Sequence, residues 1–200
     1  VLVWPFFIAM QHPTKQQKLA AYRAFLGQKA THTEASGFDV TDAEIHTALF
    51  PHQRDIVRWC IHGGRRAGFQ SFGTGKTVEQ LEITRLTHIR HGKPTLIICP
   101  LGVKQEFQRD ATTILGMPAP IYVRTSDEIK SHTEAGAVYF VTNYERVREG
   151  GIDVNIFGTV CLDEASVLRG FGTKTYQTFL PIFKDIPYRY VFTATPSPNR

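Results

Sequence analysis

A short glycine-rich stretch of the sequence has the residue types of a phosphate-binding loop. Gly73 and Gly75 flank Thr74, and Lys76 and Thr77 follow directly. Glycine allows positive φ and a close approach of the backbone to phosphate oxygens, and a lysine in this place can reach the β and γ phosphates. A threonine hydroxyl at the start of the next helix can bind Mg²⁺. The stretch therefore predicts a site for a triphosphate and Mg²⁺.

This stretch departs from the standard loop pattern in one place. The pattern has a glycine five residues before Gly75, where this chain has Gln70. The preceding segment 66–72, RAGFQSF, is also an unconvincing strand. A helix N-terminus that happens to carry Gly-Lys-Thr is therefore an alternative, and the rest of the chain has to decide.

Two adjacent acidic residues follow an apolar run in the stretch TVCLDEAS. Asp163 at the end of a buried strand can hold the Mg²⁺ shell of a P-loop ATPase, and Glu164 is suited to polarise the attacking water. A solvated turn is the alternative, and the upstream Gly-Lys-Thr makes it less attractive. Thr193 and Thr195 end another apolar run, where their hydroxyls either link the phosphate site to a neighbouring surface or only precede a proline turn.

The elements that would position these residues alternate along the chain. Continuous apolar runs are typical of strands buried on both faces of a parallel sheet, and their alternation with helices predicts an α/β fold with right-handed crossovers. Ligands in such sheets bind at the carboxyl ends of the strands. The predicted strands are 95–100, 121–123, 138–143, 157–164 and 190–195, and the predicted helices include 52–64, 77–91, 103–115 and 174–184.

The first 44 residues are predicted to be an N-terminal extension. Segment 1–9 is apolar but too short to span a bilayer. It is a core strand, a clipped signal segment or, as we favour, sequence from upstream of a true start at Met10. Segment 15–29 predicts a short docking helix, and the polar segment 30–47 a connection with a capping-box-like TDAEI.

The composition is that of a globular protein, because 42% of the 200 residues are hydrophobic and 20% are charged. A net charge of +5 is compatible with nucleic acid but is weak evidence for it. Cys60, Cys99 and Cys161 lie far apart in apolar surroundings, which predicts buried, reduced thiols, no structural zinc and a cytosolic protein. Apart from segment 1–9, nothing suggests a membrane.

Five ordered stretches resemble the first motor domain of superfamily 2 helicases and translocases, nearest to the Swi/Snf-like or phage-type DEAD/DEAH-box branch. The superfamily often lacks the first loop glycine, which accounts for Gln70. An upstream segment, LFPHQRDIVRW, is similar to the one whose glutamine recognises adenine, here Gln53. The five stretches are FQSFGTGKT (motif I), LIICPLGVKQEFQRD (motif Ia), YFVTNYERV, CLDEASVLRG (motif II) and TATPSP (motif III).

The resemblance implies a RecA-like P-loop NTPase domain over residues 45–200, with a mainly parallel sheet flanked by helices. It implies catalytic roles for Lys76, Asp163 and Glu164, Mg²⁺ ligation by Thr77 and Asp163, and coupling through Thr193 and Thr195. ATP would be bound by Gln53, Gly73, Thr74, Gly75, Lys76 and Thr77. Nucleic acid would lie along Pro100, Leu101, Gly102, Thr142, Asn143 and Tyr144, and strand-to-helix turns are the alternative interpretation of these six residues.

Three features depart from the superfamily pattern. Ser166 stands where many relatives carry histidine, and Arg169 where Swi/Snf relatives usually carry lysine. The sequence also stops at Arg200, directly after motif III, so we expect a second RecA-like domain with its arginine finger to be missing. The isolated chain is then expected to hydrolyse ATP hardly at all.

The sequence thus predicts the ATP-binding part of a DNA helicase or translocase that uses Mg²⁺ and ATP, located in bacterial or phage-infected host cytoplasm. Two alternatives stay open at this point. One is the motor subunit of a restriction-modification system, and the other is a nucleotide-gated DNA-binding module without hydrolysis.

Overall fold

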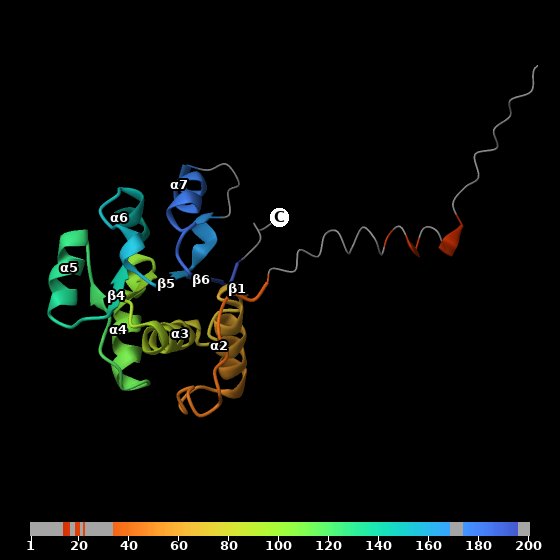
Figure 1. Cartoon of the computed structure of the whole chain (residues 1–200), viewed down its shortest axis with the longest axis horizontal. Helices are drawn as coiled ribbons and strands as arrows, with labels where there is room; N and C mark the ends of the chain where they lie inside the picture. Colours follow the sequence, from red (N-terminus) through yellow and green to blue (C-terminus); the bar gives the residue numbers. More distant parts are fainter. Residues whose placement is uncertain (1–13, 17–18, 21, 23–33, 169–173, 196–200) are drawn as a thin grey trace, which may run out of the picture. The chain divides into compact units, whose positions relative to one another are not determined.

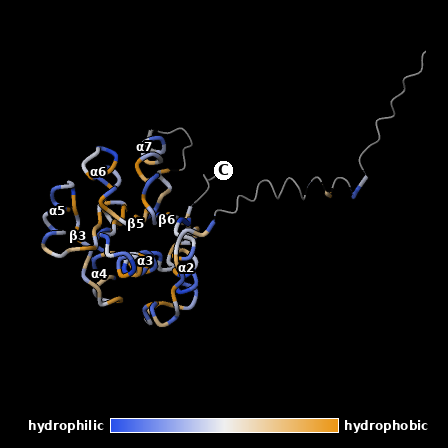
Figure 2. The backbone as a smooth tube through the Cα atoms, viewed as in Figure 1, coloured by the Kyte–Doolittle hydropathy of each residue, from blue (hydrophilic) through white to orange (hydrophobic). Residues whose placement is uncertain are grey.

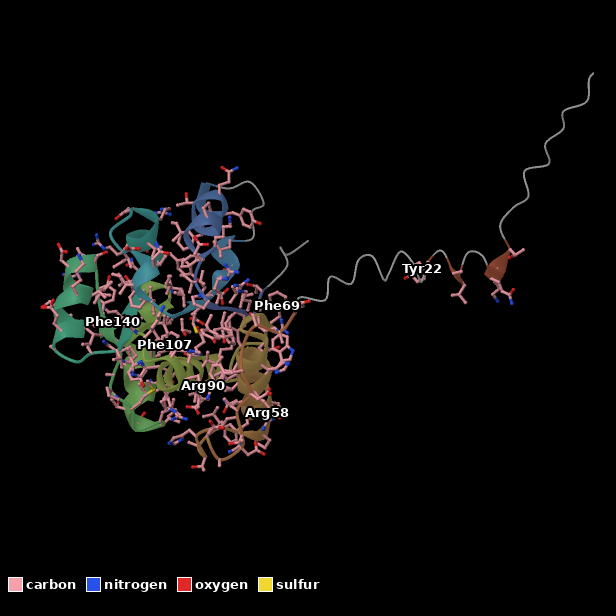
Figure 3. All side chains as sticks on the ribbon, in the orientation of Figure 1. Tyr22, Arg58, Phe69, Arg90, Phe107 and Phe140 are labelled. Atoms are coloured by element: carbon pink, nitrogen blue, oxygen red, sulfur yellow. The ribbon has the colours of Figure 1, made fainter. Side chains whose placement is uncertain are left out.

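A computed structural model describes residues 14–16, 19–20, 22, 34–168 and 174–195. The chain forms two units, residues 1–34 and 35–200. In the first unit the described residues 15, 16, 19, 20 and 22 are helical, and Leu19 is exposed. Tyr22, labelled in Figure 3, is exposed as well. The predicted segment 1–9 and the rest of the predicted helix 15–29 lie outside the described residues.

Residues 35–44, assigned above to the extension, belong to the second unit. The backbone N–H groups of Gly37 and Phe38 donate to the carbonyl oxygens of His62 and Ile61 at 3.1 and 3.2 Å. Val40 is buried in the core. In the TDAEI stretch the Glu44 carboxylate accepts from the Thr41 N–H and hydroxyl, both at 2.7 Å, and the segment forms a turn instead of a helix.

The described part of the second unit contains a six-stranded sheet whose strands are all parallel, which confirms the predicted class. The strand order is β1-β6-β5-β2-β4-β3. The strands are β1 (Arg65–Phe69), β2 (Thr95–Ile98), β3 (Ile121–Tyr122), β4 (Tyr139–Thr142), β5 (Thr159–Asp163) and β6 (Tyr188–Thr193).

Helices cover both faces of this sheet (Figure 1). One layer is α2 (Pro51–Gly63), α3 (Lys76–His91) and α4 (Lys104–Thr113); the other is α5 (Ser126–Glu134), α6 (Tyr144–Arg148) and α7 (Lys174–Ile182). Short 3₁₀ turns lie at Leu101–Val103, Val154–Ile156 and Ala165–Leu168. The predicted helices are therefore confirmed with slightly different ends.

The core lies in two layers because successive strand residues point to opposite faces. Leu96 and Ile98 of β2 pack on the α5–α7 side, and Ile97 packs on the α2–α4 side. Figure 2 shows the matching hydropathy pattern, with apolar residues along β5 and polar ones on the outer turns of α5. Phe107 and Phe140, labelled in Figure 3, are fully buried, one on each side of the sheet.

The three cysteines are free and buried, as predicted. Burial raises the pKa of the Cys60 and Cys99 thiols to about 12, because a thiolate loses its hydration in the apolar interior. No helix among the described residues is long and apolar enough to cross a membrane.

The six strands of the sheet all run in the same direction. Their carboxyl ends therefore meet at one edge of the sheet, where ligands bind in folds of this class.

Candidate functional site

The predicted phosphate-binding loop joins the end of β1 to the start of α3. Gly75 is the N-cap of α3 with φ of 86°, and Gly73 has φ of 76°, so both lie in the left-handed region that favours glycine. A Cβ atom on Gly75 would also collide with Nε2 of Gln53. The start of a helix presents backbone N–H groups without intrahelical partners to the loop before it, an arrangement that favours anions.

Lys76 lies within this loop. Its ammonium group donates to the carbonyl oxygens of Ser71 at 2.9 Å and Gln70 at 3.4 Å. It also lies 5.5 Å from the ring centroid of Phe72, which is largely exposed. The positive charge is thus held at the mouth of the loop by neutral acceptors.

The predicted acidic pair faces the same space. Strand β5 ends at Asp163, and both carboxylates line a cleft of about 450 Å³ together with the loop. The cleft is lined by Phe72, Gly73, Gly75, Lys76, Thr77, Pro100, Val103, Glu106, Asp163 and Glu164. The fold therefore brings together residues that lie far apart in the sequence. They meet at the carboxyl ends of the strands, as the sequence predicts.

Asp163 has a buried partner that the sequence analysis missed. The amide Nε2 of Gln80, one turn into α3, donates to Asp163 Oδ1 at 2.7 Å, and Gln80 is fully buried. Burial, together with the neighbouring charge of Glu164, raises the pKa of the Asp163 carboxyl above its usual value, although the Gln80 hydrogen bond and the charge of Lys76 act in the opposite direction. Gln80 lies one helical turn after Lys76, so its spacing in the sequence indicates that it is on the same side of α3 as Lys76. Only the fold shows that the carboxylate it faces is Asp163.

Among the described residues, Glu164 is the one non-glycine residue with a positive φ, which is 50°. Such a conformation costs a residue with a Cβ atom about 1–2 kcal/mol, and it is common at functional sites. Glu164 Oε1 accepts from the hydroxyls of Thr193 at 3.1 Å and Thr195 at 3.3 Å. The two predicted coupling residues thus contact the predicted water-activating carboxylate, and their coupling role stays a prediction.

Ser166, one of the two residues of motif II that depart from the superfamily pattern, lies in the 3₁₀ turn Ala165–Leu168 that follows the acidic pair. Ser166 Oγ donates to the Glu164 carbonyl oxygen at 3.4 Å, so the side chain at the histidine position contacts the backbone of the acidic pair. Arg169 lies outside the described residues.

Gln53, predicted to recognise adenine, is bonded at both ends of its amide. Oε1 accepts from the Phe50 N–H at 2.9 Å, and Nε2 donates to the Thr74 carbonyl oxygen at 3.1 Å. The side chain is buried, and it ties the start of α2 to the loop. Beside it, the exposed Phe50 ring stacks on His52, whose Nε2 lies 3.3 Å from the same Thr74 oxygen. Base recognition stays a prediction.

The residues predicted to lie along nucleic acid fall into two groups. Leu101 and Gly102 are exposed and Pro100 is half-buried, in the turn that follows β2 beside the cleft. The segment at the end of β4 is buried instead.

Each side chain of that buried segment has a partner inside the protein. Thr142 Oγ1 donates to the Val123 carbonyl oxygen at 2.8 Å, and Asn143 Nδ2 donates to Glu145 at 2.6 Å. Tyr144 donates its hydroxyl to the Asp163 carbonyl oxygen at 2.6 Å. Of these three side chains, only Tyr144 forms a hydrogen bond with a residue of the cleft. The contact of all three with nucleic acid stays a prediction.

Comparison with solved structures establishes the fold. The UvsW helicase of bacteriophage T4 superposes with a TM-score of 0.58 at 15% identity, covering 86% of this chain and 60% of that one. The Sulfolobus solfataricus SWI2/SNF2 ATPase core, solved with dsDNA, gives a TM-score of 0.61 at 19% identity, covering 80% of this chain and 35% of that one. The Pyrococcus furiosus Hef helicase domain gives a TM-score of 0.58 at 20% identity, covering 74% of this chain and 34% of that one.

The chain has the fold of these helicase and ATPase domains, a RecA-like α/β fold. This confirms the predicted resemblance at the level of the fold. No protein-family model and no curated protein matches the sequence. The chain spans between 34% and 60% of the length of these helicase structures.

Proposed function

We propose that this chain is the ATP-binding motor domain of a DNA helicase or translocase, in which hydrolysis of ATP drives movement on DNA. One observation carries the proposal. A single cleft at the carboxyl ends of the strands contains the loop with Lys76 and the acidic pair Asp163 and Glu164, and the threonines at the end of β6 are bonded to Glu164. The helicase fold supports the same interpretation.

The residues of the cleft fit a Mg²⁺-bound triphosphate. Hydroxyl and carboxylate oxygens suit Mg²⁺, and Thr77 and Asp163 supply one of each on the lining of the cleft. Bound Mg²⁺ would neutralise negative charge on the phosphate oxygens. Because Gln80 holds one oxygen of Asp163, the orientation of this carboxylate is fixed before any ligand binds.

Each remaining group has a distinct task in this proposal. The N–H groups at the start of α3 bind phosphate oxygens, and Lys76 exchanges the neutral carbonyl oxygens of Ser71 and Gln70 for charged ones. Glu164 polarises the attacking water. Its hydrogen bonds to Thr193 and Thr195 couple a change in the nucleotide site to the position of β6.

Movement on DNA would also require a second RecA-like domain. An arginine supplied from such a partner typically contributes about 10³–10⁵ in rate in well-studied NTPases. The exposed turn at Leu101 and Gly102 beside the cleft is our candidate for contact with the DNA backbone. The same proposal places the protein in bacterial or phage-infected host cytoplasm.

The test is nucleotide binding and turnover with matched variants. Lys76→Ala should weaken binding of a fluorescent ATP analogue by the chain, whereas Lys130→Ala, which removes the same charge from α5, should not. In a protein that joins this chain to a second RecA-like domain, Glu164→Gln should retain ATP binding and abolish turnover. Equal ATPase rates for Glu164→Gln and the unmodified protein would refute the assignment.

A further inference from the structure

Gln70 occupies the place of the missing loop glycine, and its side chain bridges two elements of the site. Its Oε1 accepts from the Thr74 hydroxyl at 3.0 Å, inside the loop. Its Nε2 donates to Glu79 Oε2 at 2.6 Å, on the first turn of α3. A glycine at this position has no atoms that could make either contact.

The backbone of Gln70 adds two further connections. Its N–H donates to the Thr193 carbonyl oxygen on β6 at 3.2 Å, and its carbonyl oxygen accepts from Lys76 at 3.4 Å. Gln70 is thus hydrogen-bonded to Thr74 of the loop, to Glu79 of α3, to Lys76 and to strand β6. No other described residue of the loop is bonded to all four.

Glu79 is the anchor of this arrangement. Its side chain is fully buried, and Gln70 is the side chain that donates to it. The other oxygen, Oε1, has no hydrogen-bond partner among the described residues. A buried carboxylate depends strongly on each hydrogen bond it accepts, so the Gln70 contact is costly to lose. This fixes the position of Gln70 relative to α3.

We propose that Gln70 and Glu79 form a brace that sets the conformation of the phosphate-binding loop, so that Gln70 is a positioning residue for nucleotide binding and not merely a tolerated replacement for glycine. The inference rests on the proposed function, because it names the means by which the same site is shaped. The brace lowers the cost of ordering the loop around phosphate, since the loop is held in one conformation in advance.

The decisive variant is Gln70→Gly, which restores the standard loop pattern in the sequence. The brace predicts that this variant binds a fluorescent ATP analogue with Mg²⁺ at least tenfold more weakly than the unmodified chain. If Gln70 only replaces a glycine, the variant binds as tightly or more tightly. Unchanged or tighter binding by Gln70→Gly overturns the inference.

Two changes at the anchor separate positioning from general stability. Glu79→Gln keeps an oxygen that can accept from Gln70, and it should bind the analogue nearly as well as the unmodified chain. Glu79→Leu removes the acceptor and should lose as much affinity as Gln70→Gly. The double variant Gln70→Gly/Glu79→Leu should lose no more affinity for the analogue than either single variant, because each single change already breaks the same hydrogen bond. A loss of binding free energy equal to the sum of the two single losses contradicts the brace.

Failure of the inference and failure of the proposed function give different results. If the unmodified chain binds no ATP analogue, the proposed function fails. The brace is then tested by hydrogen exchange of the backbone amides of residues 71–75, which Gln70→Gly should speed at least tenfold and Glu79→Gln should leave unchanged. Equal exchange in Gln70→Gly and the unmodified chain overturns it.

Discussion

Replacing Gln80 with leucine should weaken Mg²⁺ binding by about 10–100-fold. The variant has a similar volume but cannot donate the 2.7 Å hydrogen bond to Asp163 Oδ1. A hydrogen bond to a charged group contributes about 1.5–3 kcal/mol, and about 1.4 kcal/mol corresponds to a factor of ten. Loss of a residue that supports a metal ligand typically costs about 10–100-fold in metal affinity, which agrees with this range.

The assay is the Mg²⁺ concentration at which binding of a fluorescent ATP analogue is half complete. Gln108→Leu is the matched control, because Gln108 also donates an amide hydrogen bond, to the Pro120 carbonyl oxygen at 3.0 Å, but lies on α4. The control should keep the Mg²⁺ midpoint of the unmodified chain. If Gln80→Leu also keeps that midpoint, the support of Asp163 by Gln80 has no consequence for metal binding and the reasoning is refuted.

Three further predictions follow from individual contacts. Gln53→Ala should raise the Michaelis constant for ATP more than for GTP in the two-domain protein, because the Gln53 amide offers the donor and acceptor that match the adenine edge. An equal increase for both nucleotides would show that Gln53 only supports the loop through Thr74 and does not recognise the base. Tyr144→Phe should lower the free energy of unfolding in urea by about 1–3 kcal/mol, because the hydrogen bond from the buried Tyr144 to the Asp163 carbonyl oxygen is lost, and an unchanged value would contradict this. Iodoacetamide at pH 8 should alkylate Cys60 and Cys99 only after unfolding, since burial raises both pKa values to about 12, and rapid labelling of the native chain would show otherwise.

The sheet and the meeting of the site residues could be predicted from the sequence. Apolar runs such as 157–164 are buried on both faces, so their composition carries a strong signal, and the parallel arrangement then places Asp163 beside the loop. The edge strand β1 is not among the strands that the sequence predicts. Its sequence RRAGF has few apolar residues, and it is defined by pairing with β6, far away in the chain.

The supporting residues could not be predicted for a different reason. Gln70, Glu79 and Gln80 are polar residues whose roles depend on which atoms face them across the loop and the sheet. Sequence spacing places Glu79 and Gln80 on the first turns of α3, but it does not show that both are fully buried. Similarly, the pattern around Thr142 and Tyr144 marks the end of a strand without showing that their side chains point inward.

The most direct test of a nucleotide site in this cleft is the change in backbone amide NMR shifts when Mg²⁺ and ATP are added to the chain. We expect the largest changes at residues 73–77 and at Asp163 and Glu164, because the cleft is lined by this loop, the start of α3 and the end of β5. Lys76→Ala should reduce all of these changes together. Shifts confined to other surfaces, or none at millimolar ATP, would show that the nucleotide does not bind in this cleft.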